Sequence, residues 1–437
     1  MIKETKDVDT EIKTAKQLLD EKMIKEKKRR NIELYTLYRI FSFDLFFYYA
    51  IIYLFLTIQK GLTPAQVLMF DAFYMFFRFI MQIPSTILIK KIGKRRSIVL
   101  ASFINLIHIV IIMLAQSFSV LLISQLLCAF GFIIKATCET DMLYDSLKHG
   151  EKRGSTFAKI DGRAVSIHYY FEGISSALAG FLYIVNPYLP MILCFLVLLI
   201  DAIISINFES IEEIEKTGKI IDEYRKIKKS FKDIFKSRRL VSLLCFNALM
   251  IAMIKIFQNV RNVVLIDLQI PIQYFGIIYA TLEIIAGIAS KFQNKIHNKY
   301  RNKTLTALGM PTAISFLIIG IILSIELDFK IKLGIIIIMF ITQYVARGPY
   351  YVLIKRYLNN FTNSKKRVEI ATANNYLENL IVSILMFCSA FVLDKLPINF
   401  TLIVVGCVAI MLSILLLDAM RTTVGLKPEL YSKRDIG

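Results

Sequence analysis

The sequence predicts an all-α membrane protein with 12 transmembrane helices in two halves of six helices each. Twelve apolar stretches are each close to the length of about 20 residues that crosses ~30 Å of hydrocarbon as a helix. A charged central segment separates the first six stretches from the last six. Composition agrees, because 56% of the 437 residues are hydrophobic, more than the core of a soluble domain normally uses.

The chain begins with a charged segment, residues 1–33, that contains no uninterrupted apolar core. We therefore expect neither a cleaved signal nor a span there. We interpret it as a basic cytoplasmic helix whose weak apolar stripe suits the anionic inner leaflet; a solvated helix that only sets topology is an equal interpretation. The first bundle, residues 34–208, follows with spans at 35–58, 65–89, 97–116, 119–145, 157–184 and 188–208.

The two halves are joined by residues 209–239, in which apolar side chains are interspersed with lysines. This pattern predicts a cytoplasmic linker with an amphipathic helix on the membrane surface. The second bundle, residues 240–420, has spans at 240–266, 272–291, 304–324, 333–356, 368–393 and 398–419. Residues 421–437 are expected to form a cytoplasmic tail.

The net charge of +20 is distributed as in a membrane protein rather than on one nucleic-acid-binding face. Lysine and arginine gather in the predicted loops between spans 2 and 3, 8 and 9, and 10 and 11. The opposite loops hold only Lys60, Lys330, Lys332 and Lys395. The positive-inside rule therefore places both termini in the cytoplasm. We expect a multi-pass protein of the cell membrane, the cytoplasmic membrane in a bacterium, that contacts anionic lipids and binds no nucleic acid.

No motif for catalysis or for a cofactor is recognisable in the sequence. The six cysteines lie inside spans without a CxxC pair, and the four histidines are scattered, so neither a disulfide framework nor a metal site is predicted. A G-x-x-x-x-G-K-[ST] phosphate loop is also missing. These features argue against an enzyme and against an ATP-driven pump. They favour a monomeric secondary transporter, because two-half bundles of this kind bind a small solute near the midplane.

The connection between spans 2 and 3 carries a family resemblance. Residues 86–95 follow the pattern G-x-x-x-D-[RK]-x-G-[RK]-[RK], with Gly93, Lys94 and Arg95 in place. On this motif, and on the six-plus-six arrangement over residues 34–420, the chain resembles the major facilitator superfamily. The resemblance implies that Lys90, Gly93, Lys94 and Arg95 form a gating loop. Thr86 replaces the first glycine and Lys90 the acidic residue, so the charge relay of that loop is not carried over intact.

A second stretch resembles the junction between helices 4 and 5 in a little-characterised bacterial branch of the same superfamily. It comprises residues 141–148 and 157–163, with Asp145, Asp161 and Arg163 as its functional candidates. This stretch says nothing about the substrate. The glycine-proline motif that the family's drug/proton antiporters carry on helix 5 is missing, which weakens the case for proton-driven drug export.

Ionisable side chains inside the spans are the candidates for binding and coupling, since each costs about 2.5–3.5 kcal/mol at a helix centre. In the resembled fold, helices 1, 4, 7 and 10 line the cavity and helices 2, 5, 8 and 11 support it. The predicted residues follow this division: Asp44, Arg78, Lys135, Glu139, His168, Glu172, Lys255, Glu283, Arg347 and Glu378. Arg261 shares span 7 with Lys255.

Two pairs of these residues predict contacts along a single helix. Lys135 and Glu139 are four residues apart and therefore share a helix face. His168 and Glu172 repeat the same spacing on span 5. Each pair is either a neutralised structural contact or a proton-coupling element, the second because histidine titrates near neutrality and a buried carboxylate can change its protonation state.

Lys255 and Arg347 lie in the middles of spans 7 and 10 without an acid nearby in sequence. If they face the cavity they favour an anionic substrate, for which arginine offers a bidentate fork. The alternative is pairing with Glu283 or Glu378 across helices. Gly348 and Pro349 follow Arg347 and predict a break in span 10, either as a gating hinge or as ordinary curvature.

The function predicted from these features is secondary active transport of a small solute by alternating access. Protons are the expected coupling ion, through Glu139, Glu172 or Asp44, and the substrate is expected to be anionic. Efflux of drugs or toxic compounds is the alternative, because aromatic residues are dense on spans 1 and 2. A transporter-like sensor or assembly partner that acts through the basic N-terminal helix is a second alternative.

Overall fold

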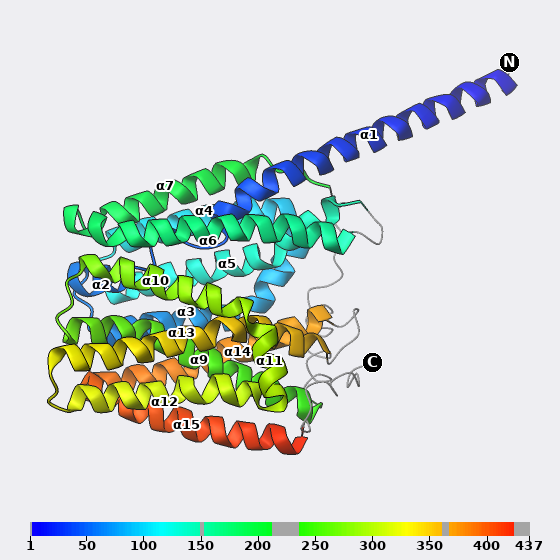
Figure 1. Cartoon of the computed structure of the whole chain (residues 1–437). Helices are drawn as coiled ribbons and strands as arrows, with labels where there is room; N and C mark the ends of the chain where they lie inside the picture. The colour runs from blue at the N-terminus through cyan, green and yellow to red at the C-terminus, as the bar shows by residue number, and fades with distance from the viewer. Residues whose placement is uncertain (1, 149–152, 212–235, 361–366, 424–437) are drawn as a thin grey trace.

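The computed structural model describes residues 2–148, 153–211, 236–360 and 367–423. These residues form helices and their connections, without a strand. The helices lie side by side in two bundles, α1 to α7 in one and α9 to α15 in the other (Figure 1). Most of the predicted linker, residues 212–235, lies outside the described residues, as do residues 424–437 of the predicted tail.

In the part of the N-terminal bundle that the structure describes, one helix is broken and five long helices are continuous. Its elements are α1 (Ile2–Ser42), α2 (Ile52–Leu54), the π-helix η1 (Phe55–Gln59), α3 (Pro64–Ile92), α4 (Lys94–Leu114), α5 (Phe118–Ser146), α6 (Arg153–Val185) and α7 (Leu189–Ile206). The start of α3 is fixed by a capping box between Thr63 and Gln66, with Pro64 at the first helical position.

The described residues of the C-terminal bundle form six long helices and two short ones. Its elements are α9 (Arg238–Asp267), α10 (Gln273–Lys291), α11 (Gln293–Tyr300), the 3₁₀-helix η2 (Arg301–Lys303), α12 (Thr304–Ser324), α13 (Phe329–Asn360), α14 (Arg367–Lys395) and α15 (Ile398–Thr423). Among the described residues, ten helices are long and apolar enough to cross a membrane. The two further predicted spans fall on α1 to η1 and on α6, so the total of twelve stays a prediction.

The first predicted span is not one helix. The N-terminal helix does not end near residue 33 but continues as α1 to Ser42, and the chain is then non-helical until Ile52, with Phe47 at φ 62°. Within this break the Asp44 carboxylate accepts hydrogen bonds from the Leu45 N–H (3.0 Å) and the Tyr49 hydroxyl. Such local bonds compete with helical ones. The His168 ring donates to the Ile40 carbonyl (2.7 Å), one of the acceptors that the helix end leaves open.

The two halves differ in the connection between their second and third spans. α3 and α4 meet at the single residue Gly93, whose φ of 83° favours glycine. The corresponding connection between α10 and α12 is not a tight loop, because α11 and η2 occupy it. Buried His297 holds α11 in place through a hydrogen bond of 2.7 Å with the Tyr357 hydroxyl of α13.

The predicted break in span 10 is absent. α13 runs through Pro349 as one helix. Gly348 has a packing role instead, since a Cβ there would lie 2.1 Å from the Ala286 carbonyl oxygen of α10. A side chain at this position would collide with the backbone of α10, so the close approach of the two helices requires glycine.

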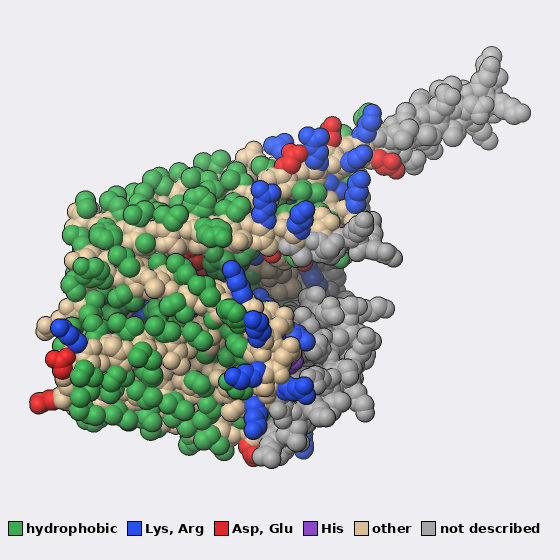
Figure 2. Space-filling model, viewed as in Figure 1, with side chains coloured by type: hydrophobic (Ala, Val, Ile, Leu, Met, Phe, Trp, Pro, Cys, Tyr) green, Lys and Arg blue, Asp and Glu red, His purple; other side chains and the backbone are tan. Residues whose placement is uncertain are grey.

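Basic side chains gather at one end of the molecule, which we call the basic end (Figure 2). It includes the α3–α4 connection, with Lys90, Lys91, Lys94 and Arg95. α1 enters the bundle and α15 leaves it at this end (Figure 1). The arrangement agrees with the charge pattern from which the sequence predicts a cytoplasmic basic end.

Candidate functional site

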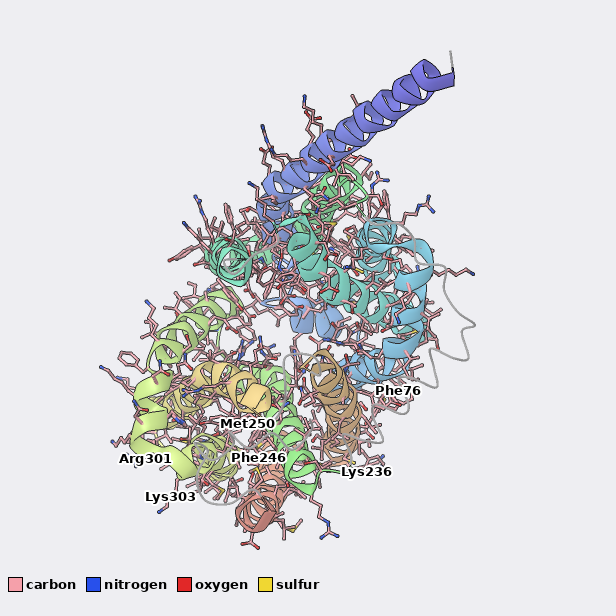
Figure 3. The ribbon with its side chains drawn as sticks, turned by 90° about the vertical axis from the view of Figure 1, so that its right-hand side faces the viewer. Phe76, Lys236, Phe246, Met250, Arg301 and Lys303 are labelled. Atoms are coloured by element: carbon pink, nitrogen blue, oxygen red, sulfur yellow. The ribbon has the colours of Figure 1, made fainter. Side chains whose placement is uncertain are left out.

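A cavity of about 380 Å³ lies between the two bundles. The N-terminal bundle lines it with the break after α1 and with α2, η1, α3 and α6, and the C-terminal bundle with α9, α10 and α13. Figure 2 shows that the surface is recessed between the halves near the basic end. Figure 3 views the molecule from that end, with Phe76 in one bundle and Phe246 and Met250 in the other. The volume is within the usual range for small-molecule sites.

The charges in the cavity are divided between its walls. The N-terminal wall carries Asp44, Asp71 and Glu172. The C-terminal wall carries Lys255, Arg261, Arg347 and Lys355, and among the described residues its single acid is Glu283. We call these the acidic wall and the basic wall.

Contacts between the halves lie toward the end of the cavity opposite the basic end. Asn259 of α9 donates to Asp71 of α3 (2.9 Å), and the Tyr279 hydroxyl of α10 donates to Glu172 of α6 (3.3 Å). Farther along, α6 and α10 approach so closely that a Cβ on Gly276 would lie 2.2 Å from the Ser176 carbonyl oxygen. The glycine therefore permits this closed arrangement.

Arg347 is held by an acid on its own wall. Its guanidinium donates two hydrogen bonds to Glu283, at 2.7 and 3.0 Å. It also lies 5.0 Å from the ring centre of Tyr344 and 5.9 Å from that of Tyr351. Both carboxylate oxygens of Glu283 are thus used, and the arginine is positioned rather than free.

Lys255 and Arg261 are the cations that α9 contributes to the basic wall, and neither has a carboxylate partner among the described residues. Among the described residues, no acid lies within 4.0 Å of either side chain. Arg261, which is 2% exposed, donates to the Tyr344 hydroxyl (2.6 Å) and to the Asn262 side-chain oxygen (3.3 Å) and lies over the Tyr279 ring. Its Nε has no acceptor among the described residues. Uncompensated cations in a buried site attract an anionic group.

His168 and Glu172 lie near each other as their spacing predicts, but not in hydrogen-bonding contact. His168 Nε2 is 3.7 Å from the Glu172 carboxylate. The histidine ring stacks on Phe46 at 4.8 Å between ring centres, while its Nδ1 bonds to Ile40. Glu172 lines the cavity, and His168 lies between Glu172 and the end of α1, where the first span breaks.

The predicted pair between Lys135 and Glu139 does not form. The Lys135 ammonium pairs with Asp201 of α7 at 2.5 Å, and Glu139 accepts from Arg39 and Tyr38 of α1. Both residues are 1% exposed and belong to the interior of the N-terminal bundle, outside the cavity lining. Charges on other helices replaced the local pair, since α1 packs against α5 and α7 carries Asp201.

The predicted gating loop and the predicted helix 4–5 junction are in contact. The Lys94 ammonium lies 2.5 Å from the Asp145 carboxylate, and Arg95 donates to the carbonyls of Ile206 (3.0 Å) and Phe208 at the end of α7. Asp161 accepts from the Tyr35 hydroxyl (2.7 Å) and from Arg39 (3.2 Å). The remaining two candidates of this region, Lys90 and Arg163, are exposed. These contacts brace the basic end of the N-terminal bundle.

Arg78 and Glu378 lie outside the cavity lining. The Arg78 guanidinium is 5.6 Å from the Tyr74 ring centre, and Glu378 accepts from Asn247 (2.9 Å) and Asn374 (3.3 Å). α3 and α14, which carry the two residues, pack across the halves through rings such as Phe73 and Phe387, whose centres are 4.9 Å apart. Much of the aromatic density predicted from spans 1 and 2 therefore belongs to packing.

Sequence reasoning missed Asp71 as a cavity residue. Asp71 lies well inside the predicted span 65–89, where an ionisable side chain is itself a functional signal. Its partner Asn259 is on the other half of the chain, and no sequence spacing indicates that contact. Within the described part of the chain no group of histidine, cysteine and acidic residues is arranged to hold a metal ion.

Comparisons with solved structures give the same architecture. The structure of the peptide transporter POT in complex with sulfate matches with a TM-score of 0.69 and 12% identity, covering 92% of this chain and 96% of that one. The nucleoside transporter NupG matches with a TM-score of 0.66 and 11% identity, covering 91% and 99%. A POT family transporter in complex with 5-aminolevulinic acid matches with a TM-score of 0.64 and 11% identity, covering 91% and 95%.

The sequence comparisons identify the family. No curated protein sequence matches the chain. The family model of the Major Facilitator Superfamily matches residues 34–384, which is most of the chain. With both bundles and the interposed cavity in place, this chain belongs to the major facilitator superfamily of secondary transporters.

Proposed function

We propose that this transporter moves a small solute with an anionic group, and that the group binds to the basic wall of the cavity. The observation that carries the proposal is the pair of α9 cations, Lys255 and Arg261, which have no carboxylate partner among the described residues and line a cavity between both halves. Alternating access follows naturally for such a cavity, since rocking of the halves would expose it to one side at a time.

Replacing Lys255 by glutamine is expected to weaken binding of the anionic group by about 10- to 100-fold, since a hydrogen bond to a charged group contributes roughly 1.5–3 kcal/mol. Equilibrium binding to the purified protein in detergent measures this change. Lys255→Arg keeps the charge and should retain most of the affinity. Lys332→Gln, at a half-buried lysine of α13 outside the cavity lining, is the control for net charge. Equal losses in Lys255→Gln and Lys332→Gln would contradict the assignment.

Proton coupling is supported best at Glu172, among the three acids that the sequence suggested. Glu139 is committed to Arg39 and Tyr38, and Asp44 to Leu45 and Tyr49. Glu172 reaches Tyr279 of the other half, so its contacts change when the halves separate. The charged or titratable groups around it are His168 on its own helix, Asp44 on the same wall, and Glu283 and Arg347 on the opposite wall.

Glu172→Gln is expected to uncouple transport from the proton gradient. The amide keeps the shape of the side chain but cannot gain or lose a proton in the way that a carboxyl group does. Gradient-driven uptake into proteoliposomes should therefore fall at least tenfold, while exchange of solute at equilibrium continues. His168→Gln removes the neighbouring titratable ring and separates its role from that of the carboxylate. Uptake in Glu172→Gln that still follows the imposed pH gradient would refute this role.

Efflux of lipophilic compounds is the weaker candidate. Aromatic residues do line the cavity, among them Tyr53, Tyr169 and Tyr351, but they alternate with charged groups on both walls. Lipophilic ligands prefer predominantly apolar pockets with few polar groups. A sensor role through α1 has one supporting feature, the exposure of Leu19, Met23 and Ile24 on the part of the helix outside the bundle. The same surface would also suit the anionic lipid leaflet.

A further inference from the structure

The charges that line the cavity balance. Four acids face it (Asp44, Asp71, Glu172 and Glu283), and four cations do so as well (Lys255, Arg261, Arg347 and Lys355). Three of the acids are on the N-terminal half and all four cations are on the C-terminal half. The cavity is therefore close to neutral as a whole but strongly dipolar across its width.

A solute with only a negative charge fits one wall of such a cavity and is repelled by the other. The repulsion matters because charges that are partly withdrawn from water interact over several ångströms far more strongly than in bulk solvent. A solute with one positive and one negative group satisfies both walls at once. This reasoning rests on the proposed function and narrows its substrate class.

Among the described residues, Asp44 is the one acid of the acidic wall that has no hydrogen bond to the opposite half. Asp44 uses a single oxygen, Oδ1, for both Leu45 and Tyr49, and its Oδ2 has no donor among the described residues. Glu283, by contrast, accepts hydrogen bonds from Arg347 with both carboxylate oxygens. Asp71 and Glu172 are engaged by Asn259 and Tyr279 of the opposite half.

The backbone around Asp44 strengthens its attraction for a cation. Asp44 follows the end of α1, where the helix leaves carbonyl groups without helical partners and the helix dipole is negative. Broken helices that expose such ends at the midplane form ion and substrate sites in other transporter folds. Lys255 faces Asp44 across the cavity without forming an ion pair within 4.0 Å among the described residues.

We infer that the transported solute is a small zwitterion, an amino acid or short peptide, whose ammonium group binds Asp44 and whose carboxylate binds Lys255 and Arg261. The two ends of the solute would bridge the halves and replace the missing contact between Asp44 and Lys255. The cavity volume of about 380 Å³ suits a solute of this size.

The test uses the full-length protein in detergent and four probes: dialanine, N-acetyl-dialanine, dialanine amide and lactate. Binding is followed by ligand-induced thermal stabilisation and by equilibrium dialysis. We expect dialanine to bind at least tenfold more tightly than either capped form. Asp44→Asn should remove the preference over the acetylated form, and Lys255→Gln the preference over the amide. The melting temperatures of the unliganded variants show whether they are folded, and Asp44→Glu should restore the preference in part.

The outcomes separate this inference from the proposed function. If N-acetyl-dialanine or lactate binds as tightly as dialanine, and Lys255→Gln weakens that binding, the solute is an anion: the zwitterion is refuted and the proposed function stands. If dialanine amide binds as tightly as dialanine and Lys255→Gln has no effect, both fail. If no probe binds to folded protein, the zwitterion is refuted for solutes of this size.

Discussion

Gly276→Leu is expected to reduce transport at least tenfold and to hold the protein with the end opposite the basic end open. The Cβ of any larger residue would lie 2.2 Å from the Ser176 carbonyl oxygen, a backbone atom that no rotamer change can remove. α6 and α10 must therefore move apart. Because these helices belong to different halves, the substitution acts on the equilibrium between the two access states and not on either bundle alone.

Gly287→Leu is the matched control for this prediction. Gly287 is on the same helix, α10, and a Cβ there meets nothing within 4 Å. Its transport rate should stay within about twofold of the original protein, as expected for a substitution at an open surface position. The rate is measured by solute exchange in proteoliposomes. If both leucine variants transport equally well, the contact between Gly276 and Ser176 does not close the cavity.

Lys135→Met is expected to destabilise the protein by about 3–5 kcal/mol, the typical cost of leaving one member of a buried ion pair alone. Lys135 and Asp201 are 1% and 0% exposed, and their charged atoms are 2.5 Å apart. Without the ammonium, Asp201 keeps a carboxylate in an interior that offers it no other cation within 4.0 Å among the described residues. Thermal unfolding in detergent, followed by monodispersity, measures the loss.

The double variant Lys135→Met/Asp201→Leu separates the charge from the packing. Removing both partners leaves no unpaired charge, so most of the lost stability should return. Solute exchange by the double variant should also be close to normal, because neither side chain lines the cavity. A double variant that is as unstable as Lys135→Met would show that the lysine stabilises through its contacts with Tyr38 and not through Asp201.

The sequence carried the positions of the helices well, because long apolar stretches and basic loops are local signals. The sequence did not predict which charged side chains pair with each other. The spacing of Lys135 and Glu139 predicted a pair on one helix. In the structure Lys135 pairs with Asp201 and Glu139 pairs with Arg39, and both partners are on other helices. The pairing of Asn259 with Asp71 likewise joins residues 188 positions apart. Such contacts depend on how helices pack, which periodicity does not encode.

The helix break was predicted in the wrong span. Gly348-Pro349 predicted a break in span 10, but the helix continues and the glycine serves the contact with Ala286. The break occurs in span 1, which contains neither glycine nor proline between Ser42 and Ile52. There, Asp44 and Tyr49 form the local contact that replaces the helix, and His168 from α6 satisfies the exposed Ile40 carbonyl. Only the tertiary structure supplies that last partner.

The most direct test of alternating access is the labelling of a cysteine placed in the cavity from each side of the membrane. Gln258→Cys on α9 suits this purpose in a background without the six native cysteines, because Gln258 lines the cavity and is uncharged, so its replacement leaves the charges of both walls unchanged. A membrane-impermeant maleimide should react at least tenfold faster from the basic side than from the opposite side, and Gly276→Leu should reverse that preference. Equal rates from both sides, unchanged by Gly276→Leu, would contradict a cavity that opens to one side at a time.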